Sequence, residues 1–163
     1  VSMRLFIAIT LSEDMKNALI TYMHQLKKQG VEGRYVSAQN LHMTLAFIGE
    51  YGDPDKVKRV IEQVPMPHFR LTLSEQGRFG KLLWAGVKGN QKLKTYVKEL
   101  RTALQQNEIP FDHDHFVPHI TLVRKSSAKK PYQAKLPRAE MVVEKVSLMK
   151  SEMRDGKVIY REL

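Results

Sequence analysis

The chain has 163 residues, of which 42% are apolar and 27% are charged, so it can fold as one compact domain or as two small lobes that share a cleft. It carries 27 Lys and Arg against 17 Asp and Glu, and the resulting net charge of +10 favours anionic partners such as nucleic acid or an anionic membrane surface. Because it contains no cysteine, a disulfide framework, a thiolate nucleophile and a thiolate metal site are all excluded.

The apolar runs are too short to cross a membrane. Residues 5–11 fall far below the roughly 20 residues that a membrane span needs, and no charged-then-apolar leader precedes them. We therefore expect a cytoplasmic protein with no membrane partner and no obligate protein partner. Val1 and Ser2, ahead of Met3, are expected to be a cloning remnant, so the fold is sought in residues 3–163.

The first half of the chain predicts two strands and two helices. Residues 4–11 and 41–48 are short apolar runs with the length of strands. Between them, residues 12–30 begin with a serine cap and two acidic residues, continue with apolar residues at helical spacing, and end at a glycine. Residues 53–64 begin with an Asp-Pro pair, a cap followed by a first-turn proline, and carry a second apolar stripe.

The second half predicts five strands and one helix. Asn90 caps the helix, and Asp155-Gly156 is a typical hairpin turn between the last two strands. The strands are expected at residues 69–73, 82–87, 119–124, 141–149 and 157–160, and the helix at residues 90–104.

This order of elements lacks the strict alternation of a doubly wound sheet, so it favours an α+β fold with antiparallel sheets. No Pro/Ser-rich linker divides the chain, which favours a single domain with two lobes. Residues 125–135 are polar and basic and are expected to form an exposed loop. Lysines in that loop can follow a polynucleotide backbone or can simply be solvated.

The pattern His-x-Thr-Leu occurs twice, at residues 42–45 (the first motif) and at residues 119–122 (the second motif), each on a predicted strand. Alternate side chains of a strand share a face, so each strand presents an imidazole and a hydroxyl on one face and two apolar side chains on the other. A lone histidine on a strand is usually a surface or core residue. Its repetition in the same context indicates function instead.

Two imidazoles supply a general base and a general acid when one is neutral and the other protonated, as their ordinary pKa near ~6.5 allows. His42 and His119 therefore suit phosphodiester cleavage, in which one group takes a proton and the other gives one. The hydroxyls of Thr44 and Thr121 can donate to phosphate oxygens, and Arg124 can neutralise the developing oxyanion or face solvent at the strand end. We expect neither a metal nor another cofactor.

With these motifs the chain resembles the two-histidine phosphoesterase superfamily, specifically the RNA 2′,3′-cyclic phosphodiesterases that are also labelled 2′-5′ RNA ligases. The resemblance covers essentially the whole chain, since the segments RLFIAI, LHMTLAFIGE, LLWAGV and PHITLVRK and the terminal hairpin follow one another in family order. It implies two pseudo-symmetric lobes of antiparallel sheet with outer helices around a central groove, all within residues 3–163.

The resemblance also implies roles for the motif residues. His42 becomes the proton donor to the departing ribose oxygen, His119 activates water, and Thr44, Thr121 and Arg124 hold the phosphate. The implied reaction is metal-independent hydrolysis of RNA 2′,3′-cyclic phosphate ends to a 2′-phosphate, with reverse 2′-5′ joining as a minor reaction. The sequence alone does not assign which histidine is the acid.

Other interpretations stay open at this stage. The protein can instead be a basic RNA-binding module without turnover, or a phosphoesterase acting on a small non-RNA cyclic phosphate or cyclic nucleotide. Tyr35 and Phe116 are candidates for stacking a nucleobase, although such aromatics also serve to pack lobes together. The Asp-His-Asp-His segment at residues 112–115 offers metal ligands but lacks partners elsewhere, which favours a polar loop leading into the second motif.

Overall fold

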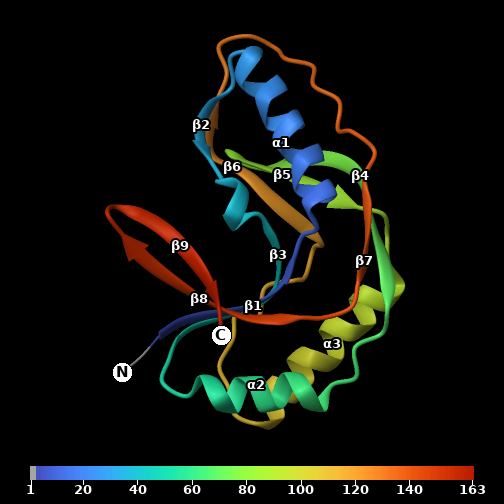
Figure 1. The fold of residues 1–163 in the computed structure, drawn as a ribbon, viewed down its shortest axis with the longest axis vertical. Coiled ribbons are helices and arrows are strands. Elements are labelled where there is room, and N and C mark those ends of the chain that lie inside the picture. The colour runs from blue at the N-terminus through green and yellow to red at the C-terminus, as the bar shows by residue number, and fades with distance from the viewer. Residues whose placement is uncertain (1–2) are drawn as a thin grey trace.

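The computed structural model describes residues 3–163, so the expected remnant, Val1 and Ser2, lies outside the described residues. All strand pairs in this part of the chain are antiparallel (Figure 1). In chain order the elements are β1 (Met3–Thr10), α1 (Glu13–Lys28), β2 (Glu32–Tyr35), a 3-10 turn η1 (Ala38–Asn40), β3 (His42–Tyr51), α2 (Pro54–Gln63), β4 (Phe69–Phe79), β5 (Leu82–Val87), α3 (Gln91–Gln106), β6 (His119–Ser127), β7 (Glu140–Val143), β8 (Ser147–Arg154) and β9 (Lys157–Glu162).

The strands form two sheets. The first sheet has the order β3-β1-β8-β9 and the second sheet the order β2-β6-β5-β4-β7. Helix α1 lies against the second sheet, whereas α2 and α3 pack on each other and lie against the first sheet (Figure 1). This arrangement confirms the predicted α+β fold with two lobes of antiparallel sheet and outer helices. No helix within residues 3–163 is long and apolar enough to cross a membrane.

The three helices begin where their sequence caps predict. Each cap side chain accepts a hydrogen bond from the backbone N–H three residues later, at 3.2 Å for Ser12, 3.1 Å for Asp53 and 3.1 Å for Asn90. These bonds satisfy N–H groups that the first turn of a helix leaves without an intrahelical partner.

Two strand predictions are corrected by the structure. The short strand β2 was not predicted, because its exposed Glu-Gly-Arg sequence shows no apolar alternation and its extended shape depends on pairing with β6. The single strand expected at residues 141–149 is two strands, since β7 pairs with β4 in the second sheet and β8 with β1 in the first. The chain crosses from one sheet to the other between them.

Strands β3 and β9 run two or three residues past their predicted ends, and β6 and β4 continue into segments that were not expected to be strand. The expected loop at residues 125–135 begins with three residues that continue β6, and only the remainder is irregular. Strand β4 continues to Phe79 although residues 74–79 are largely polar and exposed, because their backbone pairs with β5 beyond a bulge. Tertiary pairing overrides the weak local pattern in both places.

A β-bulge lies at the last residue of each His-x-Thr-Leu motif. The residues on either side of Leu45 pair with consecutive residues of β1, and those on either side of Leu122 pair with consecutive residues of β5. Each leucine is therefore an extra residue without a partner on that neighbour. As a result, the two residues after each motif threonine, Leu45 and Ala46 in one and Leu122 and Val123 in the other, are all 0% exposed.

The bulged leucine carbonyls are bonded differently. The Leu122 carbonyl accepts from the backbone N–H of Val36 at 2.9 Å, just beyond β2. Strand β3 is an edge strand, and the Leu45 carbonyl instead accepts from the Arg101 side chain of α3, at 3.2 Å from Nε and 3.0 Å from Nη2. Arg101 Nη1 also donates to the carbonyl of Asp114 at 2.7 Å.

One large hydrophobic cluster fills the interior between the sheets and their helices, with members from both sheets. A smaller cluster lies on the opposite face of the first sheet. It consists of Phe6, Ala8 and Met149, with Phe47 and Tyr160 partly buried against it. The ring of His42 lies on this same face, with its centroid 5.0 Å from that of the Phe6 ring. We call this face, which points away from the large cluster, the inner face of the first sheet.

We predict that Arg101→Met lowers the free energy of unfolding by roughly 1–3 kcal/mol, because the partly buried Leu45 carbonyl loses its hydrogen bonds. Urea denaturation followed by circular dichroism measures the change. Lys98→Met is the matched control, since it removes the same charge from an exposed position of the same helix. Equal loss in the two variants would show that the Leu45 contact contributes nothing.

Candidate active site

Both motif imidazoles are held in the same way. The Nδ1 atom of His42 lies 2.7 Å from the carbonyl oxygen of Asn40, and that of His119 lies 2.6 Å from the carbonyl oxygen of Val117. A carbonyl oxygen can only accept, so Nδ1 carries the hydrogen and donates it in each ring. The tautomer is thereby set, and Nε2 is left as the atom that can give or take a proton.

The surroundings of His42 are aromatic and largely enclosed. Its Nε2 lies 2.8 Å from the Thr44 hydroxyl oxygen on the same face of β3. The rings of Phe6 and Tyr160 lie 5.0 and 5.1 Å away, centroid to centroid, so β1 and β9 both support it. Asn40 also links this region to β9, because its side-chain amide donates to the Val158 carbonyl at 2.9 Å.

His119 lies beside two aromatic residues of the β4–β5 hairpin that the sequence did not indicate. Its ring centroid is 5.4 Å from that of Phe79 and 6.2 Å from that of Trp84, and Trp84 pairs across the strands with Thr121. Phe79 is 47% exposed, which is unusual for a large apolar side chain. The indole of Trp84 lies so close to Gly77 that a side chain there would collide with it, which explains the glycine.

Burial and positive charge both act on the pKa of His42. Burial lowers the pKa of His42 below its ordinary value, the hydrogen bond to Asn40 opposes this, and the positive charges of Arg124 and His119 lower the pKa further. Since β3 and β6 also contact each other, the structure brings these three predicted residues together from two strands and both sheets. The free site therefore favours a neutral His42.

A second arginine accompanies Arg124. In the pairing of β2 with β6, Arg34 lies directly opposite Arg124, and the next pair is Tyr35 with Val123. Paired residues share a face, so the two guanidinium groups extend from the same side of the sheet. Within residues 3–163 neither forms an ion pair. Like charges in register destabilise a sheet unless an anion lies between them, so this pair suits a phosphate.

Arg34 is hard to single out from the sequence, because it lies in β2, the strand that lacks an apolar pattern. The available signal was its position in the GRYV segment shortly before the first motif. Only the register with β6 shows that it stands beside a predicted phosphate-binding residue.

Within residues 3–163, neither predicted stacking residue makes a ring contact with a motif imidazole. Tyr35 packs against the large core cluster, donates its hydroxyl hydrogen to the Val31 carbonyl at 2.7 Å and has the Lys27 ammonium 4.6 Å above its ring. Phe116 is also packed against that cluster, and the Arg101 guanidinium lies 5.7 Å from its ring centroid. These surroundings favour the packing interpretation for both residues.

The Asp-His-Asp-His segment connects α3 to the second motif and covers the edge of β3. The backbone N–H of Asp112 donates to the Phe47 carbonyl at 2.8 Å, and its carboxylate accepts from the Asp114 N–H at 3.0 Å. The His113 ring stacks on Phe111 at 4.2 Å. In the described part of the chain no three His, Cys, Asp or Glu side chains gather as a metal site, and the geometry favours a structural connection.

Comparison with known proteins links this arrangement to one family. Residues 16–155 match the family described as the 2′-5′ RNA ligase superfamily. A protein named RNA 2′,3′-cyclic phosphodiesterase from Thermotoga maritima is 29% identical over 176 residues, which covers 99% of this chain and 93% of that protein. A protein of the same name from Escherichia coli is 31% identical over 129 residues, which covers 76% of this chain and 73% of that protein.

A solved structure shares the fold over the full length. The crystal structure of E. coli LigT complexed with 3′-AMP has a TM-score of 0.88 and 27% sequence identity, and the match covers 100% of this chain and 96% of that one.

We predict that the pKa of His42 lies below the ordinary value of an imidazole in an NMR pH titration of the free protein, and that Arg124→Gln raises this pKa. The sign follows because removal of a nearby positive charge makes the protonated ring less unfavourable. Lys92→Gln, on the exposed side of α3, should leave the His42 titration unchanged. An unchanged midpoint in Arg124→Gln would mean that Arg124 does not act on His42.

Proposed function

Because the chain belongs to the 2′-5′ RNA ligase superfamily, we propose that it hydrolyses 2′,3′-cyclic phosphates at RNA ends, opening the ring on its 3′ side to leave a 2′-phosphate. The relatives named RNA 2′,3′-cyclic phosphodiesterase support the substrate class. The observation that carries the proposal is the pair of imidazoles, each held through Nδ1 by the carbonyl two residues earlier and close enough for one charge to affect the other.

The proposed reaction needs only water and two proton transfers. Nε2 of neutral His119 takes a proton from water as the water oxygen attacks phosphorus. The bond from phosphorus to the 3′ oxygen breaks, and that oxygen takes a proton from Nε2 of protonated His42. The phosphate stays on the 2′ oxygen, and proton exchange with solvent restores the pair.

Three side chains are proposed to hold the phosphate during this step. Thr44 already bonds Nε2 of His42, so its hydroxyl lies next to the atom that would protonate the leaving oxygen. Thr121 lies on the same strand face as His119, and Arg124 supplies a fixed positive charge. Charge-assisted hydrogen bonds to the non-bridging oxygens would stabilise the pentacovalent state more than the ground state.

The lowered pKa of His42 bears on the acid role. A neutral ring in the free protein cannot protonate a leaving group, yet a bound cyclic phosphate brings a negative charge beside it. That charge favours protonation, so substrate binding would itself prepare the acid. The opposite assignment, with His42 as the base, agrees with the free-site pKa, and the direction therefore has to be tested.

We expect His42→Ala and His119→Ala each to lose roughly 10²-fold or more of kcat on a 2′,3′-cyclic mononucleotide, the usual contribution of one positioned acid or base. The double variant should lose much less than the product of the two, because the residues act as a unit. Circular dichroism checks that each variant is folded. Unchanged turnover in either single variant would refute the paired mechanism.

The direction of proton transfer follows from a substrate with an activated leaving group, which needs little protonation as it departs. Such a substrate should rescue the variant that lacks the acid, expected to be His42→Ala, and leave His119→Ala slow. Rescue of His119→Ala instead would reverse the two roles. Rescue of neither would indicate that the imidazoles position phosphate without transferring protons.

We expect hydrolysis to continue in excess EDTA, because the two imidazoles supply both the acid and the base of the proposed reaction. The rate is measured after dialysis against the chelator, with and without added Mg²⁺, Mn²⁺ or Zn²⁺. Loss of turnover that a divalent ion restores would contradict the metal-independent mechanism.

A further inference from the structure

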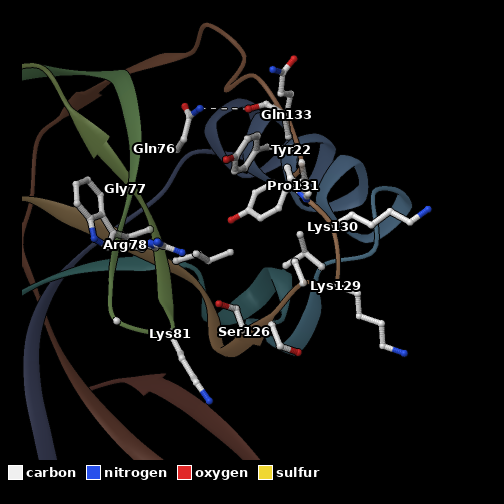
Figure 2. A pocket seen from close by; sticks show the side chains of 18 of the residues that line it. Tyr22, Gln76, Gly77, Arg78, Lys81, Ser126, Lys129, Lys130, Pro131 and Gln133 are labelled. Atoms are coloured by element: carbon white, nitrogen blue, oxygen red, sulfur yellow. Dashed lines mark hydrogen bonds between the residues drawn. The ribbon is translucent and has the colours of Figure 1, made fainter.

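We propose that a basic cavity outside the catalytic site binds the single-stranded RNA that precedes the cyclic end. The inference rests on the proposed function for the nature of the polymer. The cavity lies between the β4–β5 hairpin, the end of β6, helix α1 and the loop of residues 128–135, which we call the strap (Figure 2). None of the proposed catalytic or phosphate-holding residues lines it.

Hydrogen bonds attach the strap to α1 on one side and to β4 on the other, so the wall of the cavity that it forms is fixed in position. Gln133 and Gln29, at the end of α1, bond each other twice: the Gln133 N–H donates to Gln29 Oε1 at 2.6 Å, and the Gln29 amide donates to the Gln133 carbonyl. On the other side, the Gln76 amide of β4 donates to the Ala134 carbonyl at 3.2 Å (Figure 2). The strap therefore spans from α1 to β4.

The lining of the cavity is cationic. It contains Arg78, Lys81, Lys129, Lys130 and Lys135 and no aspartate or glutamate. None of these five side chains forms an ion pair within residues 3–163. Lys129 and Lys130 extend from the strap on the side away from the β4–β5 hairpin (Figure 2). Unpaired cations grouped around one cavity attract an anion with several charges, such as a phosphodiester chain.

Aromatic side chains lie inside the cationic rim. Tyr22 of α1 and Tyr132 of the strap both line the cavity, and burial, with a smaller contribution from Tyr132, raises the pKa of Tyr22 to about 12. The partly exposed ring of Tyr132 can stack a base, whereas Tyr22 is only 4% exposed and can offer little more than its protonated hydroxyl as a hydrogen-bond donor. Cations that follow a backbone, combined with aromatic faces for bases, are the usual composition of a single-strand binding site.

The β4–β5 hairpin connects the cavity to the catalytic site. Phe79 lies beside His119 on one face of the hairpin, whereas its neighbours Arg78 and Lys81 line the cavity. Trp84 borders both, since it lines the cavity and its ring lies 6.2 Å from that of His119. A strand whose end lies at His119 would thus pass over this hairpin to reach the cations.

The size of the cavity favours a polymer over a single small molecule. Its volume is about 1170 Å³, above the roughly 300–1,000 Å³ of typical small-molecule pockets. We therefore assign it to the nucleotides upstream of the cyclic phosphate. A free nucleotide shares the same chemistry, and substrate length distinguishes the two ligands.

The test compares a 2′,3′-cyclic mononucleotide with oligoribonucleotides of up to about ten nucleotides that end in the same cyclic phosphate. In the native protein, kcat/KM should rise with length. In the double variant Lys129→Ala/Lys130→Ala, kcat/KM for the oligonucleotide should fall severalfold at low salt, while turnover of the mononucleotide stays unchanged. The slope of log kcat/KM against log salt for the oligonucleotide should become shallower by about 0.7 per lysine removed. The control is Lys92→Ala/Lys94→Ala, which makes the same charge change on α3 and should leave kcat/KM unchanged for both substrates.

The other outcomes are decisive as well. If kcat/KM of the native protein does not depend on substrate length, the ligand of the cavity is not an RNA strand, and a free nucleotide takes its place in the assignment. If the strap variant loses kcat/KM equally on both substrates, the strap only supports the catalytic lobe. Binding of a fluorescent oligonucleotide with a 3′ phosphate, measured by anisotropy, keeps the test independent of turnover. If the native protein hydrolyses neither substrate, the proposed function fails. The cavity assignment then stands if the strap variant alone loses affinity, and falls if it does not.

Discussion

The candidate site depends on the β-bulge at the last residue of each motif. In a regular strand, residues three positions apart lie on opposite faces, so Arg124 would point away from Thr121 and into the core. The unpaired Leu122 shifts the alternation by one residue, which buries Val123 and returns Arg124 to the side where its charge acts on His42. A bulge commonly re-aims a side chain in this way beside a functional site.

The bulge at Leu45 has the same effect in the first lobe, but there it turns a phenylalanine to the inner face in place of an arginine. There the residue three positions after the threonine is Phe47, which joins the small cluster on the inner face, and the Arg4 guanidinium lies 4.9 Å from its ring centroid. The edge position of β3 leaves the carbonyls of Leu45 and Phe47 without a strand, and Arg101 and the segment before the second motif bond them. The approach to the second motif thus stabilises the strand of the first, which couples the two lobes.

Much of this was readable from the sequence, because the signals were local. Helix caps, apolar periodicity and the repeated motif each lie within a few residues, and they located the three helices, most strands and both imidazoles. The features that were missed depend on pairing between distant segments. Arg34 is placed by the register of β2 with β6, and Phe79 and Trp84 reach His119 through a hairpin whose outer half is polar. The bulge that turns Arg124 inward also has no local signature in the sequence.

Positive charge in the candidate site connects the fold with the proposed chemistry, because it bears both on phosphate binding and on the protonation of His42. Arg34 and Arg124 stand in register and form no ion pair with any acidic residue of the described chain, residues 3–163. The charge of Arg124 also disfavours a protonated His42 in the free protein. In the proposed function, the arrival of a phosphate between the arginines and the imidazole would remove both costs. A neutral ligand would leave the repulsion in place. The site would therefore select an anion before any chemistry begins, and it would acquire its proton donor only when the anion to be cleaved is bound.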